Sequence, residues 1–191
     1  YRIPAIVKSK KGTLLAFVEG RRTGRSDWGD IDILLKRSSD NGRTWSPALT
    51  VADFDRDTIG NPAPVLDRRT GTIWLLLTRN PGDVPEKNIQ PGLSGPTRTV
   101  WITHSKDDGL TWATPVDITR SVKRPDWSWY ATGPVNGIQT KSGRLVIPCD
   151  HDRDHQHYSH VIYSDDAGQT WQIGGIVGPG ANESTIAEAT D

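Results

Sequence analysis

Charged side chains that can bind a small anion and move a proton occur near both ends of this sequence. Arg2 and Arg21 carry planar guanidinium groups, which can bind a carboxylate through two parallel hydrogen bonds. Asp27 and Glu183 carry carboxyl groups, the usual proton donors and acceptors where a bond is cleaved. Each residue type also has a plainer interpretation: Arg2 as a surface arginine at the start of a strand, and Asp27 as a cap for the bend at Asp27-Trp28-Gly29.

A second polar cluster lies between residues 150 and 157. Its members are three aspartates and three histidines: Asp150, His151, Asp152, Asp154, His155 and His157. Such a cluster can bind a metal ion. It contains no cysteine and no regular H-x-x-x-H spacing, so a solvated polar loop is the preferred interpretation and no metal site is predicted.

Composition excludes several classes of function. Lys plus Arg and Asp plus Glu number 23 each, so no overall charge favours nucleic acid or an anionic membrane, although a local basic pocket for a small anion remains possible. No apolar run approaches the roughly 18–20 residues that a membrane helix needs. Cys149 is the single cysteine, which excludes a disulfide framework and a Cys-rich zinc site.

The pattern of apolar residues predicts an all-β chain. Short runs in which apolar and polar residues alternate are typical of half-buried strands. Turn signals such as Lys11-Gly12 and Asp108-Gly109 separate them, and no amphipathic helix is predicted. The candidate strands are residues 1–7, 13–18, 31–37, 72–78, 99–104, 144–149 and 158–163. Residues 59–64 and the Pro- and Gly-rich residues 80–96 are predicted to form loops.

The sequence repeats an eight-residue pattern, S-x-D-x-G-x-T-W, at Ser38–Trp45, Ser105–Trp112 and Ser164–Trp171. The aspartate can accept hydrogen bonds from backbone N–H groups of its own turn, the glycine can adopt a positive φ, and the tryptophan can pack back over the hairpin. Each copy follows a candidate strand. We therefore interpret the repeats as turns that build the scaffold, away from any chemistry.

The spacing of the repeats predicts a β-propeller. It is somewhat longer than the roughly 40–50 residues of common four-stranded blades, which fits blades with long connecting loops. Three copies predict about three blades, too few to close a ring. A chain with only these blades would leave sheet faces uncovered, and we expect it to be poorly stable alone.

These repeats resemble the Asp-boxes of sialidases and related propellers. Tyr1-Arg2-Ile3-Pro4 resembles the sialidase [F/Y]-R-I-P motif, and it precedes an Asp-box as it does in that family. Three further segments resemble sialidase sequences: 19–31, 129–139 (where Val135 replaces a usual glycine) and 182–188. The resemblance covers essentially the whole chain. It implies a six-bladed β-propeller of the bacterial exo-α-sialidase type, with residues 1–191 as the N-terminal half of the catalytic domain and about its first three blades.

The resemblance also implies roles for residues near the N-terminus. Arg2 matches the first of three arginines that bind the carboxylate of sialic acid. Arg21 matches a further arginine near the carboxylate or the acid/base, with Arg22 as the neighbouring candidate. Asp27 matches the acid/base that protonates the leaving group, with Asp30 and Asp32 as local rivals.

Further roles follow for residues nearer the C-terminus. Sialidases use a tyrosine nucleophile, and Glu183 matches the glutamate that removes its proton, with Glu188 as the alternative. The tyrosine and the other two arginines are expected beyond Asp191, so the isolated chain is expected to be inactive. Asn61, Tyr130 and Asp150 are the candidates for further contacts with substrate. No metal and no cofactor is implied.

The implied activity is retaining hydrolysis of terminal sialic acid from glycoproteins, glycolipids and oligosaccharides. This substrate class implies a secreted, cell-surface or periplasmic protein. Two alternatives remain. One is a non-catalytic Asp-box propeller that binds a glycan or a protein, and the other is an Asp-box glycosidase that acts on another sugar. The first alternative does not need Arg2, Asp27 and Glu183 together, and the second does not need the three carboxylate-binding arginines.

Overall fold

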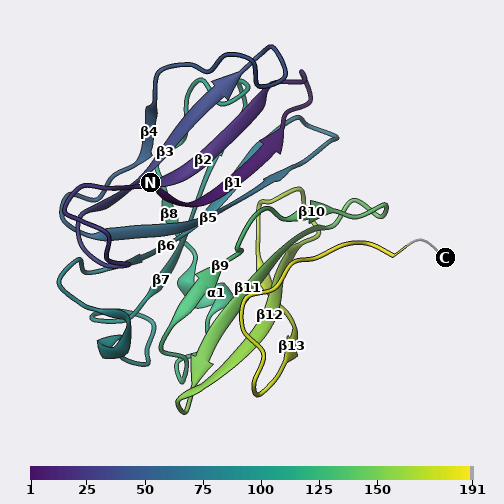
Figure 1. Ribbon diagram of the computed structural model, residues 1–191. Helices are drawn as coiled ribbons and strands as arrows, with labels where there is room; N and C mark the ends of the chain where they lie inside the picture. The colour runs from purple at the N-terminus through teal and green to yellow at the C-terminus, as the bar shows by residue number, and fades with distance from the viewer. Residues whose placement is uncertain (190–191) are drawn as a thin grey trace.

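The computed structural model describes residues 1–189, and its regular secondary structure is almost entirely β-strand (Figure 1). Three antiparallel sheets follow one another along the chain. The first contains β1 (Arg2–Lys8), β2 (Leu14–Arg21), β3 (Ile31–Ser38) and β4 (Leu49–Ala52). The second contains β5 (Thr58–Leu66), β6 (Ile73–Asn80), β7 (Thr99–Ser105) and β8 (Val116–Asp117). A single parallel pair, Ile31 with Thr58, joins these two sheets.

The third sheet has a divided inner strand. β9 (Tyr130–Thr132) and β10 (Ile138–Gln139) both pair with β11 (Leu145–Arg153), which is followed by β12 (Gln156–Ser164) and β13 (Gln172–Val177). The helical elements are a 3-10 turn, η1 (Glu86–Asn88), and a short helix, α1 (Thr119–Val122). Within residues 1–189, no helix has the length and apolar character needed to cross a membrane.

All seven predicted strands are present, but two predicted loops are wrong. Residues 59–64 lie in β5, where Ile59 and Ala63 are buried and the prolines and Asn61 mark a register irregularity rather than a break. Residues 150–157 form a hairpin between β11 and β12. Its two turn residues, Asp154 and His155, have φ values of 52° and 59°, as a two-residue hairpin turn requires.

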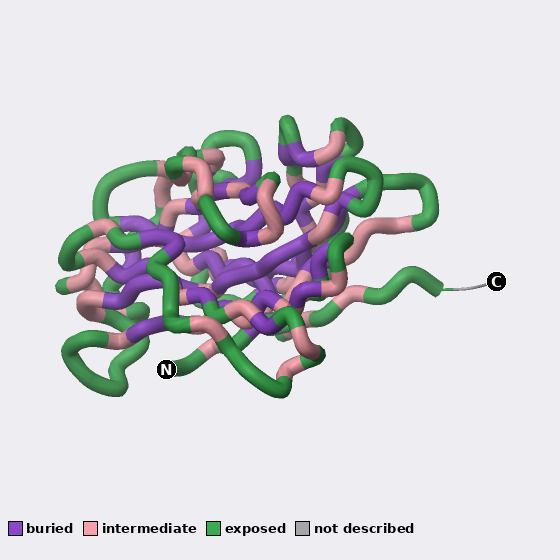
Figure 2. Tube along the Cα trace, turned by 90° about the horizontal axis from the view of Figure 1, so that it is seen from above, coloured by how far each residue is buried: buried purple, intermediate pink, exposed green. Residues whose placement is uncertain are grey.

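Buried side chains form two clusters. One fills the first and second sheets around Phe17, Ile33 and Leu75, and the other joins the second and third sheets around Leu76, Trp127 and Ile147. Figure 2 shows this arrangement: buried segments run through the middle of the trace, and exposed segments form loops at its edges. The strand ends and their connecting loops are therefore held by a rigid core.

The three Asp-boxes adopt the predicted turn, each between two strands that pair with each other. In the first, Asp40 accepts hydrogen bonds from Thr44 N (2.9 Å) and Thr44 Oγ1 (2.6 Å), and Gly42 has a φ of 86°. The same bonds recur in the other two copies. The expected packing of the tryptophan holds for Trp171, which is buried, but Trp45 is 39% exposed.

The later Asp-boxes also bind the preceding sheet. Asp108, in the second box, accepts hydrogen bonds from Thr13 Oγ1 (2.6 Å) and Arg37 Nη2 (2.9 Å) of the first sheet. In the third box, the carbonyl of Ala167 accepts a hydrogen bond from the indole of Trp74 in the second sheet (3.0 Å). The boxes are scaffold, as predicted, and they tie neighbouring sheets together.

Candidate active site

The innermost strand of each sheet is irregular at the same place. A residue with positive φ precedes a proline in all three: Ile3 (51°), Asn61 (54°) and Gly133 (92°). The register shifts after Arg2 in β1 and after Gly60 in β5, and the strand is interrupted between β9 and β10. Bulges of this kind redirect side chains away from the ladder. Residues from all three inner strands therefore face one cavity.

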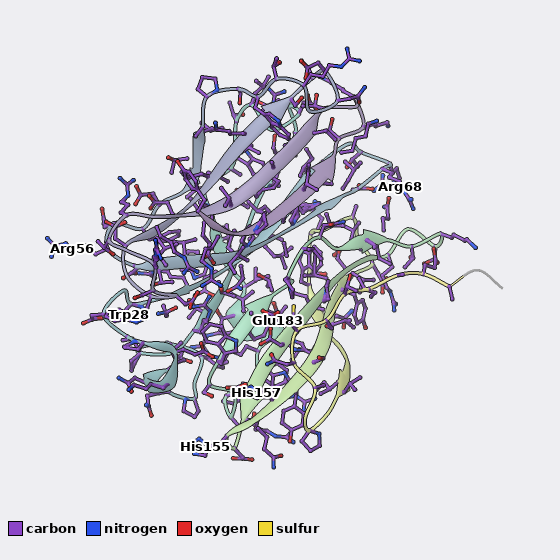
Figure 3. All side chains as sticks on the ribbon, viewed as in Figure 1. Trp28, Arg56, Arg68, His155, His157 and Glu183 are labelled. Carbon is purple, nitrogen blue, oxygen red and sulfur yellow. The ribbon has the colours of Figure 1, made fainter. Side chains whose placement is uncertain are left out.

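This cavity has a volume of about 240 Å³. Six of the seven residues predicted to form the site line it: Arg2, Arg21, Asp27, Asn61, Asp150 and Glu183. They come from all three sheets and from the segment after β13, whose Glu183 is labelled in front of the third sheet in Figure 3. The other lining residues are Ile3, Glu19, Glu86, Arg98, Trp129, Ala131 and Asn182. The cavity is thus mostly polar and contains charges of both signs.

Arg21 connects two carboxylates in this cavity. It lies two residues after Glu19 on the same face of β2, and its Nη2 donates to Glu19 Oε2 (2.7 Å) and to Asp27 Oδ1 (2.6 Å). Arg2 Nη1 donates to the same Asp27 oxygen (2.9 Å). Burial lowers the pKa of Arg21, but its hydrogen bonds to Glu19 and Asp27 outweigh burial and raise that pKa overall. Asp27 is therefore held by two guanidinium groups while half of its side chain stays exposed.

The rival residues on the same loop lie elsewhere. Arg22 faces away from Arg21 and pairs with Asp32 Oδ2 (2.6 Å) and Asp30 Oδ1 (3.3 Å). Burial raises the pKa of Asp32, and the hydrogen bond from Arg22 lowers it in part. None of these three lines the cavity, so Asp27 is the carboxylate of this loop that faces the candidate substrate site.

Arg98 is a buried residue of the cavity that the sequence did not identify. Its Nε donates to the carbonyl of Tyr130 (2.8 Å), and its terminal nitrogens donate to the side-chain oxygens of Asn80 and Asn61. Its guanidinium lies 4.2 Å above the ring of Trp129. Burial lowers the pKa of Arg98 to about 10. Arg98 stands between a loop and β7 without a distinctive motif, so only the folded structure reveals it.

A buried lysine fixes the backbone around Arg98. Lys123 Nζ donates to Thr97 Oγ1 (2.7 Å), to the carbonyl of Arg98 (2.7 Å) and to the carbonyl of Ser128 (2.8 Å). Burial, with a smaller contribution from the Arg98 charge, lowers the pKa of Lys123 to about 7. Lys123 therefore links the segment that carries Arg98 to the segment that carries Trp129.

Asp150 is almost completely buried at the base of the cavity. It stands opposite Ala131 in the β11–β9 ladder, and its Oδ2 accepts a hydrogen bond from Trp129 Nε1 (3.0 Å). The pKa of Asp150 is raised to about 7, mainly by burial and in part by the charge of Glu183, while the hydrogen bond from Trp129 and the charge of Arg98 lower it. This carboxyl group can therefore change protonation near neutral pH.

Tyr130 does not line the cavity with its side chain. Strand residues alternate between faces, so Trp129 and Ala131 face the cavity while Tyr130 points into the core. Its ring packs 4.9 Å from that of His160. Tyr130 contributes its backbone carbonyl, which holds Arg98. Of the predicted site residues, Tyr130 is thus the one whose side chain does not line this cavity, and its neighbour Trp129 does.

The two candidate glutamates near the C-terminus are separated. Glu183 lines the cavity, next to Asn182, whose carbonyl accepts a hydrogen bond from the hydroxyl of Ser159. Glu188 instead accepts hydrogen bonds from the backbone N–H of Lys141 (2.9 and 3.0 Å). Glu183 is therefore the glutamate that can act in this cavity.

The acidic and histidine-rich hairpin is the segment interpreted above as a solvated polar loop rather than a metal site. Among residues 1–189, no three His, Cys, Asp or Glu side chains are grouped so that they could hold a metal ion. His151 and His160 are buried, with their Nδ1 atoms 3.0 Å apart, and His157 pairs with Asp152 (2.5 Å).

Comparison with known proteins places the chain in a family. Residues 12–190 match the model of the BNR repeat-like domain. The chain is 35% identical over 209 residues to an exo-alpha-sialidase of Aspergillus fumigatus (100% of this chain, 49% of that protein). It is 30% identical over 202 residues to a sialidase of Bacteroides fragilis (98% and 37%). The chain therefore spans about half the length, or less, of these curated relatives.

Solved structures agree. The Hadza microbial sialidase Hz136 superposes with a TM-score of 0.91 at 32% identity, over 95% of this chain and 38% of that one. The Trypanosoma rangeli sialidase superposes with a TM-score of 0.81 at 18% identity, over 98% of this chain and 32% of that one, and supports the fold alone. The three sheets are thus blades of a six-bladed β-propeller, and the chain belongs to the sialidase family.

Proposed function

We propose that this chain is the N-terminal half of the catalytic domain of an exo-α-sialidase, which hydrolyses terminal sialic acid from glycans with retention. One observation carries the proposal: Arg2, Asp27 and Glu183, far apart in sequence, line the same cavity. A cation for the substrate carboxylate, an acid for the leaving group and a base for the nucleophile are thus within reach of one sugar.

Asp27 is the proposed general acid. Its carboxyl group gives a proton to the glycosidic oxygen as the bond between the anomeric carbon and that oxygen breaks. Asp27 Oδ1 receives hydrogen bonds from Arg2 and Arg21, which fix the position of the carboxyl group at the cavity. Arg2, the proposed partner of the substrate carboxylate, is thus in direct contact with the proposed acid.

Glu183 is the proposed base for a tyrosine nucleophile. A neutral tyrosine can approach an anomeric carbon that carries a carboxylate without the repulsion that a carboxylate nucleophile would meet. Its phenol has an ordinary pKa of about 10, so it needs a base. Glu183 is exposed at the cavity and can accept that proton. We propose that the tyrosine and two further arginines belong to the part of the protein that this chain does not span.

The proposed function is tested by assaying the complete protein on an α-sialoside and on glycosides of neutral sugars. Release of sialic acid alone supports it, and Arg2→Ala should lower kcat/KM for the sialoside by on the order of 100-fold because the carboxylate loses a bidentate partner. Arg68→Ala, a surface arginine outside the cavity, is the matched control. Binding of sialosides without turnover would favour a non-catalytic propeller, and turnover of another glycoside would favour a different glycosidase.

A further inference from the structure

A second, larger cavity of about 860 Å³ adjoins the first. The two share three lining residues, Asp27, Glu86 and Trp129. The larger cavity extends between the loop after β2, the segment around η1 and the tip of the β11–β12 hairpin. Trp28 and His155, both labelled in Figure 3, project from two of these elements. No role proposed above uses this space.

The position of Asp27 indicates which part of the substrate enters the larger cavity. A general acid must lie within hydrogen-bond reach of the leaving oxygen. If sialic acid occupies the smaller cavity, the oxygen that Asp27 protonates lies at the border between the two, and the remaining glycan begins there. The larger cavity is the described space that continues from Asp27, and its volume lies within the range of sites for small ligands.

The charges of the larger cavity restrict the chemistry of this glycan. Five carboxylates line it: Asp27, Glu86, Asp126, Asp152 and Asp154. Lys87 and His155 are the cationic or titratable counterparts among the lining residues, and His157 pairs with Asp152 from outside the lining. Carboxylates accept hydrogen bonds from sugar hydroxyls, whereas they repel a second carboxylate.

Aromatic side chains add a surface suited to a sugar ring. Trp28 is 43% exposed, and Trp129 stands at the border of the two cavities. An exposed indole next to hydroxyl-binding carboxylates offers an apolar face together with polar partners.

We propose that the larger cavity binds the neutral sugar from which sialic acid is released, and that its carboxylates select against glycans in which the next sugar is itself acidic. This inference rests on the proposed function and extends it to the linkage. Sialic acid attached to a neutral hexose is the preferred substrate class, and sialic acid attached to a second sialic acid is disfavoured.

The test compares kcat/KM of the complete enzyme for a sialyl-lactose and for a disialyl oligosaccharide. The wild type should prefer sialyl-lactose, by on the order of tenfold at low ionic strength, and salt should reduce this preference because exposed charges are screened. The triple variant Asp126→Asn, Asp152→Asn, Asp154→Asn should bring the ratio close to one. Asp83→Asn removes an exposed carboxylate near η1 that does not line the cavity, and it should leave the ratio unchanged.

A second variant tests the stacking surface. Trp28→Ala should lower kcat/KM for sialyl-lactose by roughly fivefold, with little effect on a sialoside whose leaving group is methanol, because methanol cannot reach the indole.

The outcomes are distinct. An enzyme inactive on every sialoside contradicts the proposed function itself. An active enzyme that cleaves both oligosaccharides equally, or whose preference survives the triple substitution, overturns the proposal about the larger cavity and leaves the proposed function intact.

Discussion

The guanidinium of Arg98 lies 4.2 Å above the indole ring of Trp129, and the same guanidinium donates to the backbone carbonyl of Tyr130, the next residue. One side chain of the second blade thus holds two consecutive residues of the third. Trp129 in turn donates to Asp150, so the base of the cavity is a chain of contacts between two blades.

Replacing Arg98 should disconnect these blades. Arg98→Met keeps much of the volume but leaves the oxygens of Asn61, Asn80 and Tyr130 without this donor. Loss of a buried charged partner costs about 3 kcal/mol, so the free energy of unfolding in urea should fall by roughly that amount. Arg79→Met is the control: Arg79 also stacks on an aromatic ring, but it lies at the half-exposed edge of the second blade. Equal losses in the two variants would contradict the assigned role of Arg98.

Asp150 should make stability depend on pH. Its pKa is raised to about 7 in the folded chain, mainly by burial, against an ordinary value near 4. Between these values the folded state binds the proton that the unfolded state has lost, so stability falls as pH rises from 4 to 7. The contribution is about 4 kcal/mol, because each pKa unit corresponds to roughly 1.4 kcal/mol.

The measurement is the difference in unfolding free energy between wild type and Asp150→Asn, at pH 5 and at pH 7.5. The wild type should lose stability relative to the variant as the pH rises. A difference that does not change between these two pH values would show that Asp150 is ionised throughout.

His151 should act in the opposite direction. Burial and nearby cations lower its pKa to about 4, and burial lowers that of His160 further. Below pH 6.5 the unfolded histidines bind protons that the folded ones do not, so stability falls as pH decreases from 6.5 to 4. His151→Phe preserves stacking on Trp127 and should flatten the acid limb of a thermal-unfolding profile. His155→Phe, on the exposed hairpin turn, should leave the limb unchanged.

Gly60 should tolerate no side chain. An added Cβ would lie 2.7 Å from Glu19 Oε1 and 3.1 Å from Arg98 Nη2, two residues that line the candidate site. Gly60→Ala should therefore displace them and lower both stability, by about 1–3 kcal/mol, and kcat/KM. At Gly175, also in a strand, an added Cβ meets nothing within 4 Å, so Gly175→Ala should change neither by much. Comparable activity in the two variants would refute the close packing at Gly60.

The Asp-box contacts between blades can be isolated with two glycines of similar φ. Gly168 (93°) and Gly143 (95°) impose the same strain on an alanine, but at Gly168 the new Cβ would lie 2.2 Å from Trp74, and at Gly143 it meets nothing within 4 Å. Gly168→Ala should therefore destabilise the protein by about 1–3 kcal/mol more than Gly143→Ala in urea titrations. Equal effects would mean that the third box does not hold the second blade.

The sequence predicted those parts of the fold that are determined by residues close together along the chain. The Asp-box turns followed from their own aspartates and glycines. The strand β5 was missed because Asn61 and two prolines resemble a loop, and only pairing with β6 keeps that segment extended. The irregularity that hides the strand from sequence analysis is also what directs Asn61 toward the cavity.

Motifs pointed to Arg2, Asp27 and Glu183, which stand in distinctive segments and line one cavity of the folded chain. Arg98 and Glu19 make contacts between blades: Arg98 donates to the carbonyl of Tyr130, and Glu19 accepts from the backbone N–H of Asn61. No spacing in the sequence indicates those contacts. The sequence did not indicate that Trp129, rather than Tyr130, faces the cavity, because the side on which a strand residue lies depends on the residue at which the strand begins.

The most direct test of the account is the effect of Asp27→Asn on two substrates of the complete enzyme, with Asp30→Asn as the matched control. A general acid matters most when the leaving group is poor. Asp27→Asn should lower kcat/KM for sialyl-lactose by about 100- to 10,000-fold, and far less for an aryl sialoside whose leaving group needs no proton. Asp30→Asn should leave both values nearly unchanged. Equal losses on the two substrates for Asp27→Asn, or a larger loss for Asp30→Asn, would contradict the assignment of Asp27 as the acid.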